Sequence, residues 1–157
     1  MSLFNLVLFL HITLIISAIT VAYGGGLVMR MAYMTGQVTA VRGVGMSMAR
    51  TAKWIPILFI SAGIFGLLAA ITGPYNTNLL APWLVIAYVL FVIAMAIGTA
   101  ITAPEGQRLG AVLMKTPDGP LTPEVRAFFE GRALWITILD YVIVAVLVFD
   151  MVVKPFS

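Results

Sequence analysis

Hydrophobic positions along the chain form four long runs, separated by two polar stretches and one short connection. The runs cover about residues 3–29, 54–72, 82–103 and 127–153. A helix needs ~20 apolar residues to cross the hydrocarbon core of a bilayer, and each run approaches or exceeds that length. The pattern therefore predicts an all-α, multi-pass membrane protein. We expect a bundle of four transmembrane helices that forms a single domain over residues 1–157.

Signals at the ends of the runs refine these helices. No Lys or Arg precedes the first run, which is also too long for a signal-peptide core, so we expect a retained helix. Pro56 lies in the first turn of the second helix, where a missing backbone donor costs nothing. Pro104 is expected to interrupt the third helix. Thr122 and Pro123 look like an N-cap and a first helical residue, so the fourth helix begins in water and enters the membrane near Ala133.

Composition supports this environment. Hydrophobic residues make up 62% of the chain and charged residues 10%, whereas soluble domains average roughly 45–50% and about 25%. These figures exclude a soluble globular domain. The absence of cysteine excludes disulfides, thiolate metal sites and cysteine nucleophiles within the chain. The net charge of +3 does not indicate a nucleic-acid partner, because the basic residues lie between apolar runs instead of forming one patch.

The basic residues predict an orientation. Only Lys154 follows the last run, and the other eight Lys and Arg residues lie around the two polar stretches. Cytoplasmic loops carry the excess of Lys and Arg in membrane proteins. We therefore expect two long cytoplasmic loops, both termini outside, and residence in the bacterial cytoplasmic (inner) membrane. The eight residues are Arg30, Arg42, Arg50, Lys53, Arg108, Lys115, Arg126 and Arg132.

Both polar stretches contain helical patterns. In the first, apolar residues recur at steps typical of one helix face. This segment either lies on the inner leaflet or docks a partner, or it extends the first helix and packs on its own neighbours. The second stretch predicts a short helix, a turn at residues 116–120 and the start of the fourth helix, so a two-plus-two repeat is possible. The apolar positions are Met31, Met34, Val38, Val41 and Met48 in the first stretch and Leu109, Val112 and Leu113 in the second.

Small residues form stripes on three of the predicted helices. Helices in lipid associate through small side chains that allow close approach. We therefore predict that these stripes pack in the interior of the bundle. They comprise Ala18, Ala22 and Gly25 on the face of His11, then Ala62, Gly66 and Ala70 in the second helix, and Ala94 and Gly98 in the third.

Three ionisable residues lie inside the apolar runs, where such groups are costly and are functional candidates. They are His11, Asp140 and Asp150. Tyr88 falls at about the depth of His11, so His11, Tyr88 and Asp150 could form one polar cluster toward the outer surface. Asp140 would form a separate inner cluster with Arg30 or Thr99.

His11 is either an axial ligand to haem or another metal, with Tyr88 in the same cofactor site, or a packing histidine with a hydrogen bond. The chain has one histidine, so one protomer cannot build a bis-histidine haem. Asp140 is either part of a proton relay or a capped buried acid. The sequence contains no Ser-His-Asp arrangement, phosphate-binding glycine loop or paired carboxylates, and therefore does not indicate an enzyme.

Several short motifs together resemble a bacterial integral-membrane family, domain of unknown function 2269. This resemblance implies four membrane helices and assigns no activity. The motifs are Leu10-His11, Gly25-Gly26-Leu27, Ala62-Gly63-Ile64-Phe65-Gly66, Pro82-Trp83-Leu84 and Met151-Val152-Val153-Lys154-Pro155.

A more distant similarity extends to the CopD-like and HemJ families, through Leu10-His11, Gly25-Gly26-Leu27 and Arg30. It implies that His11 binds haem or a metal. The HemJ pattern has a lysine shortly after the tryptophan of the third helix. Residues 83–88 contain none, which argues against porphyrinogen oxidation.

The sequence thus favours a small, non-enzymatic accessory or assembly subunit of a larger redox or energy-transducing membrane complex. Its expected partners are the lipid bilayer and other membrane subunits or a second copy, with no nucleic acid. The alternative is a haem-binding redox protein that uses His11. Ion or metal transport would need a continuous polar path, but the polar residues divide into outer and inner groups.

Overall fold

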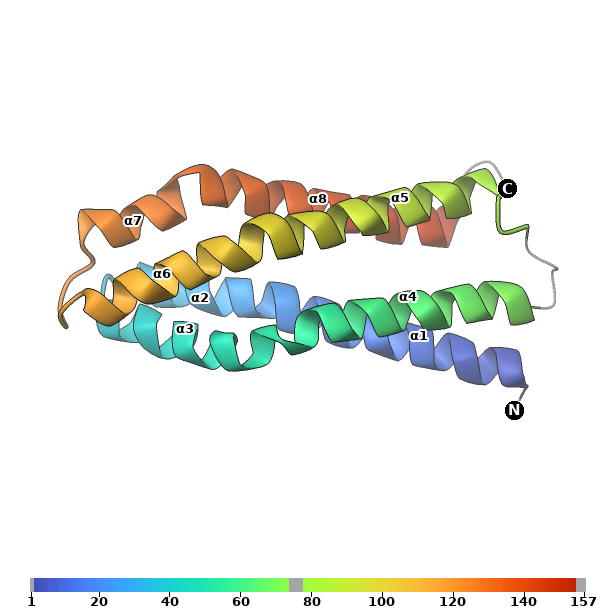
Figure 1. Cartoon of the computed structure of the whole chain (residues 1–157), viewed down its shortest axis with the longest axis horizontal. Coiled ribbons are helices and arrows are strands. Elements are labelled where there is room, and N and C mark those ends of the chain that lie inside the picture. The colour runs from blue at the N-terminus through green and yellow to red at the C-terminus, as the bar shows by residue number, and fades with distance from the viewer. Residues whose placement is uncertain (1, 74–77, 155–157) are drawn as a thin grey trace.

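The computed structural model describes residues 2–73 and 78–154, and these form an elongated helical bundle (Figure 1). At one end α1 and α5 begin and α4 and α8 end, whereas α3, α6 and α7 gather at the other end. Four segments are long and apolar enough to cross a membrane, which confirms that the chain has four helices able to span one. They are Leu3–Met34, Trp54–Thr72, Pro82–Lys115 and Pro123–Val153.

The first half of the chain contains two long helical segments. The first comprises α1 (Leu3–Ile19), the π-helical turn η1 (Thr20–Gly24) and α2 (Gly25–Met34), and so continues beyond the predicted end at residue 29. After a tight turn, α3 (Val38–Ala52) leads into α4 (Trp54–Thr72). The bounds predicted for the second membrane helix, residues 54–72, are confirmed. The short connection after α4 is described only at residue 73 and from residue 78 onward.

The second half begins with α5 (Pro82–Ile97), the π-helical turn η2 (Gly98–Thr102) and α6 (Ala103–Lys115). The prediction that Pro104 interrupts this helix is wrong. A proline ring normally clashes with the carbonyl four residues earlier. Here the wider π-helical turn replaces that spacing just before Pro104, so the helix continues to Lys115.

The fourth membrane segment is divided into α7 (Pro123–Glu130) and α8 (Arg132–Val153). The predicted N-cap is confirmed, because the hydroxyl of Thr122 accepts a hydrogen bond from the backbone N–H of Val125 at 3.4 Å. A continuous helix over residues 127–153 is not formed. The helix is interrupted at Gly131, where an added Cβ would lie 2.7 Å from the carbonyl oxygen of Ala127.

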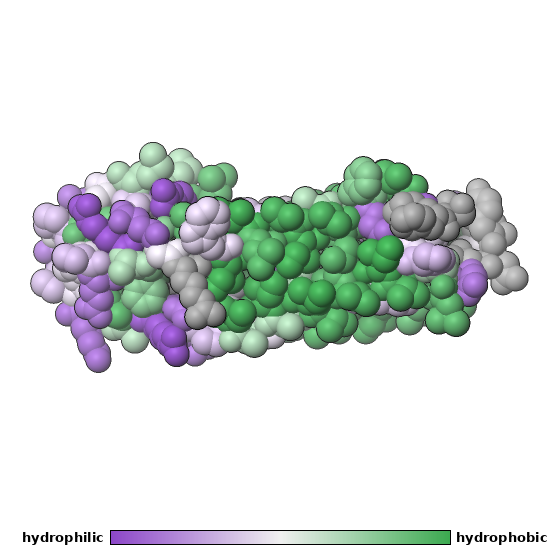
Figure 2. All heavy atoms as spheres, turned by 90° about the horizontal axis from the view of Figure 1, so that it is seen from above, coloured by the Kyte–Doolittle hydropathy of each residue, from purple (hydrophilic) through white to green (hydrophobic). Residues whose placement is uncertain are grey.

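The membrane helices pack as two pairs, α1 with α4 and α5 with α8 (Figure 1). The two pairs meet where the ring of Phe91 on α5 packs against Gly63 of α4. A Cβ added to Gly63 would lie 3.3 Å from Cζ of Phe91. In the view of Figure 2 an apolar band covers the middle of the molecule, and hydrophilic side chains collect at one end.

The two halves share one order of elements: a helix with a π-helical turn, a reversal, a short helix and a membrane helix. Their reversals pair with each other. The N–H of Val38 donates to the carbonyl of Gly119, and the N–H of Leu121 donates to the carbonyl of Gly36, each at 2.9 Å. Both glycines have positive φ, 72° and 142°, which other residues rarely adopt. The possible two-plus-two arrangement is therefore present in the structure.

The largest fully buried side chains lie at the hydrophilic end, in a cluster that we call the cap. It joins the end of α2 to α3, α6, α7 and the turn before α7. Val38 and Val41 are fully buried in it, so this part of the amphipathic stretch packs on its own neighbours. Met31 and Met34 remain 62% and 76% exposed. The cap residues are Ala32, Val38, Val41, Leu113, Leu121 and Val125.

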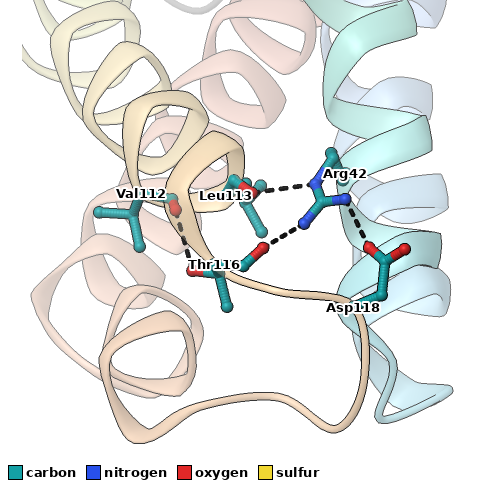
Figure 3. Close-up of polar contacts among 5 residues, drawn as sticks. All are labelled: Arg42, Val112, Leu113, Thr116 and Asp118. Atoms are coloured by element: carbon teal, nitrogen blue, oxygen red, sulfur yellow. Dashed lines mark hydrogen bonds and ion pairs between the residues drawn. The ribbon is translucent and has the colours of Figure 1, made fainter.

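Arg42 fastens the turn after α6 to α3 (Figure 3). Its Nε donates to the carbonyl of Leu113 at 2.9 Å, another guanidinium nitrogen donates to the carbonyl of Thr116, and a third forms an ion pair with Asp118 at 2.6 Å. Two carbonyls at the end of α6 that have no partner within the helix are thereby satisfied. A guanidinium suits this task because its donors form a fixed planar fork.

Candidate functional site

An open cleft of about 970 Å³ lies between the two halves, next to the cap. Residues of α1, η1 and α2 form one wall, η2 and α6 form another, and α7 and α8 close the third side, with Met48 of α3 between them. Most lining side chains are aliphatic or aromatic. The volume falls within the range of roughly 300–1,000 Å³ typical of small-molecule sites. This cleft is the candidate site.

The hydroxyl groups of Tyr23 and Tyr141 give the cleft wall one polar patch. The Tyr23 hydroxyl donates to Asp140 Oδ2 at 3.1 Å, and the two tyrosine rings meet edge to face with centroids 4.6 Å apart. Asp140 Oδ1 is buried and has no hydrogen-bond partner among the described residues. Asp140 was expected near Arg30 or Thr99, but its observed partner is Tyr23. The contact caps one oxygen of the carboxylate and leaves the other without a partner, so both the proton relay and the capped acid stay predictions.

Glycines allow the side chains of this wall to pack closely. An added Cβ on Gly26 would lie 2.9 Å from the Tyr141 hydroxyl, and one on Gly25 would lie 3.0 Å from Cε of Met48. Gly24, which ends η1, has nothing within 4 Å. Two of the three consecutive glycines, Gly25 and Gly26, therefore let Met48 and Tyr141 pack closely against the helix. This agrees with the close contact predicted at Gly25.

Arg30 contributes a positive charge to the cleft. Its guanidinium carbon lies 5.1 Å from the centre of the Tyr33 ring. The nearby acids are engaged elsewhere, since Glu105 pairs with Arg108 at 2.9 Å and Glu130 accepts a hydrogen bond from Tyr33. Within residues 2–73 and 78–154, no carboxylate forms an ion pair with Arg30 within 4 Å.

His11 lies between α1 and α4, away from this cleft. Its Nδ1 is 2.7 Å from the carbonyl oxygen of Ala62, and the imidazole lies against Gly66, where an added Cβ would be 2.8 Å from Cε1. A carbonyl only accepts hydrogen bonds, so Nδ1 carries the proton in neutral His11 and Nε2 keeps its lone pair. This arrangement satisfies a packing histidine and is also the one that metal-ligating histidines adopt.

The predicted outer cluster of His11, Tyr88 and Asp150 is not formed. His11 belongs to the α1–α4 pair, whereas Tyr88 and Asp150 belong to the α5–α8 pair. Tyr88 is 38% exposed and is not a hydrogen-bond partner of His11. Asp150 is 3% exposed, and its Oδ2 has no partner in the described part of the chain. Helical depth alone did not reveal this separation, because it does not specify which helices pair.

The small-residue predictions have different outcomes. Ala18 is fully buried, Ala22 is partly buried, and Gly66 receives the His11 ring. Gly25 packs against α3. Packing of Gly98 inside the protomer is contradicted, since an added Cβ there meets nothing within 4 Å. Gly98 begins η2, whose wider turn changes the direction of this helix face.

Sequence patterns did not identify Tyr23, Tyr141 or Arg42 as important. The signal available for the tyrosines was a phenol within an apolar run, which needs a hydrogen-bond partner when buried. In the part of the chain that the structure describes, no group of three or more His, Cys, Asp or Glu side chains could hold a metal ion.

Comparisons with protein-family models, curated proteins and solved structures found no match to this chain. The site is therefore interpreted from its own residues.

Proposed function

We propose that the chain is a small protein of the bacterial cytoplasmic membrane, with its cap in the cytoplasm and both termini outside. The distribution of charge supports this orientation. Seven Lys and Arg residues lie between the start of α2 and the end of α7, Arg132 begins α8, and only Lys154 follows the last membrane helix. Positive charge of this kind marks the cytoplasmic side.

Within that membrane the protein acts as a non-enzymatic accessory or assembly subunit of a larger redox or energy-transducing complex. The observation that carries this proposal is the low burial of the membrane segments. In the most apolar 18-residue stretch of each segment, only 11% of the residues are buried by the rest of the chain. Gly98 adds a small, open position on the face of the α5–η2 segment, suited to close approach by a neighbouring helix.

The mass of the particle extracted from its native membrane in mild detergent tests this function. We expect a particle several times larger than the 16.9 kDa chain, beyond the contribution of detergent. Gly98→Leu should shift it toward the single chain. Gly43→Leu is the matched control, because Gly43 also has nothing within 4 Å but lies on α3. A single-chain particle from unaltered protein would refute the subunit proposal.

Haem binding through His11 is the second candidate, favoured by the hydrogen bond between Nδ1 and the carbonyl of Ala62, which in a neutral imidazole leaves the lone pair of Nε2 for a metal. The resemblance to CopD-like and HemJ proteins assigns the same residue this role. His11 would supply one axial nitrogen, and bound haem would supply one-electron chemistry. A Soret band in the purified protein that disappears in His11→Ala supports this candidate. A colourless protein from haem-replete cells excludes it.

A further inference from the structure

We propose that the cleft binds an anionic phospholipid, with its phosphate at Arg30 and an acyl chain along α8. The binding site comprises Arg30, the Tyr23–Tyr141 wall and the apolar side of α8. It requires neither a cofactor at His11 nor a partner at Gly98. Three features of the cleft identify this occupant.

The first feature is length. The lining residues on α8 extend from Leu134 to Val148. At a rise of about 1.5 Å per residue this stretch is ~21 Å long, or about two thirds of a hydrocarbon core of ~30 Å. Its side chains include Ile138, Val144 and Ala145. We call this apolar side of the cleft the trough. Its length suits an acyl chain better than a compact polar metabolite.

The second feature is the charge at one end of the trough. Arg30 faces the cleft, and the neighbouring carboxylates of Glu105 and Glu130 are engaged by Arg108 and Tyr33. A guanidinium can bind phosphate oxygens with two parallel hydrogen bonds. Basic pockets between membrane helices on the cytoplasmic side commonly bind anionic head groups. This charge favours an anionic lipid over a neutral lipophile.

The third feature is a preformed wall partway along the apolar side of the cleft. Tyr23 is held by Asp140 and by the edge of the Tyr141 ring, and Gly26 leaves room for the Tyr141 hydroxyl. Arg30 follows Tyr23 by seven positions, a rise of ~10 Å along a helix. The tyrosines therefore lie deeper than the charge, beside the part of the cleft that an acyl chain would occupy.

Lipid retention by the full chain tests this proposal. The protein is placed in mixed micelles with equal amounts of phosphatidylglycerol and phosphatidylcholine carrying the same acyl chains. Native mass spectrometry then counts the lipids that remain bound. We expect one retained phosphatidylglycerol in preference to phosphatidylcholine. Arg30→Gln should reduce that preference about fivefold. Both lipids carry the phosphate, but only phosphatidylglycerol has a net negative head group, which the positive charge of Arg30 favours.

Two matched pairs of variants separate the site from general lipid contact. Arg50→Gln removes a positive charge from α3 outside the cleft and should leave the preference unchanged. Ala145→Phe fills the trough and should lower retention of both lipids. Val142→Phe adds the same ring at an exposed position of α8 outside the cleft lining and should not. Thermal melting of each variant establishes that it is folded.

The proposal is overturned if folded, unaltered protein retains both lipids equally. It is also overturned if Arg50→Gln reduces the preference as much as Arg30→Gln, which would indicate a diffuse attraction to the cap. Unchanged lipid retention in folded Ala145→Phe would show that the chain does not occupy the trough.

Discussion

The hydroxyl of Tyr23 donates a hydrogen bond to Asp140 across 3.1 Å and thereby connects residues separated by 117 positions in the chain. The two residues come from the first and last membrane segments. In hydrocarbon, a polar group without a partner costs several kcal/mol. This contact therefore holds the two halves of the bundle together at the cleft.

Removing the Tyr23 hydroxyl should lower the free energy of unfolding. We expect Tyr23→Phe to destabilise the protein by about 1–3 kcal/mol, because the carboxyl of Asp140 loses its partner. The double variant Tyr23→Phe, Asp140→Leu should lose less than the sum of its single variants, since both polar groups are then absent. Unfolding in detergent with added denaturant measures these changes.

Tyr141→Phe is the control for this pair. The Tyr141 hydroxyl lies 3.5 Å from the carbonyl oxygen of Tyr23, a weaker contact. Its removal should therefore cost less than that of the Tyr23 hydroxyl. Equal losses in the two phenylalanine variants would show that the contact with Asp140 carries no special weight.

Gly66 and His11 should be energetically coupled. A methyl group on Gly66 would lie 2.8 Å from the His11 ring, so we expect Gly66→Ala to cost about 1–3 kcal/mol through overpacking. The same substitution in a His11→Ala background should cost much less, because the clashing ring is absent. Thermal unfolding of the four proteins gives the coupling energy.

Gly24→Ala is the matched control for Gly66→Ala. Gly24 is also helical and has nothing within 4 Å. Alanine there should be neutral or stabilising by up to about 1 kcal/mol, because it restricts the unfolded chain. Additive effects of Gly66→Ala and His11→Ala would contradict the observed contact.

Arg42 should stabilise the cap mainly through its backbone hydrogen bonds. We expect Arg42→Met to cost about 1–3 kcal/mol, because the carbonyls of Leu113 and Thr116 lose their partner. Asp118→Asn should cost below about 1 kcal/mol, since the Asp118 side chain is 69% exposed and solvent screens the ion pair. Hydrogen exchange of residues 113–121 measures the local opening.

Arg50→Met provides the comparison for Arg42→Met, because Arg50 lies in the last turn of the same helix and is exposed. It should leave exchange of residues 113–121 unchanged. If Asp118→Asn opened the turn as much as Arg42→Met, the ion pair and not the backbone contacts would be the main stabilising interaction.

Local signals in the sequence were sufficient for much of the fold. Run length gave four spanning segments, and Thr122 with Pro123 marked the start of α7. The effect of Pro104 was mispredicted because a preceding π-helical turn is a backbone adjustment without a clear sequence signature. Gly131, which breaks the fourth segment, was not anticipated.

The candidate site was less predictable, because it depends on which helices are neighbours. Sequence spacing placed His11 and Tyr88 at similar depths but could not assign them to different helix pairs. Asp140 was recognised as an intramembrane acid, whereas its partner Tyr23 depends on contact between the first and last membrane segments. Depth follows from helical rise, but pairing follows from side-chain packing across the bundle.

The side of the membrane on which the cap lies can be measured with single cysteines, because the natural chain contains none. Gly43→Cys places a thiol at an exposed position of α3, and Asn78→Cys places one at an exposed position before α5. Spheroplasts are treated with a membrane-impermeant maleimide before and after lysis. A cytoplasmic cap predicts labelling of Asn78→Cys in intact spheroplasts and of Gly43→Cys only after lysis. The reverse pattern would contradict the proposed orientation and, with it, the expected position of Arg30 on the cytoplasmic side.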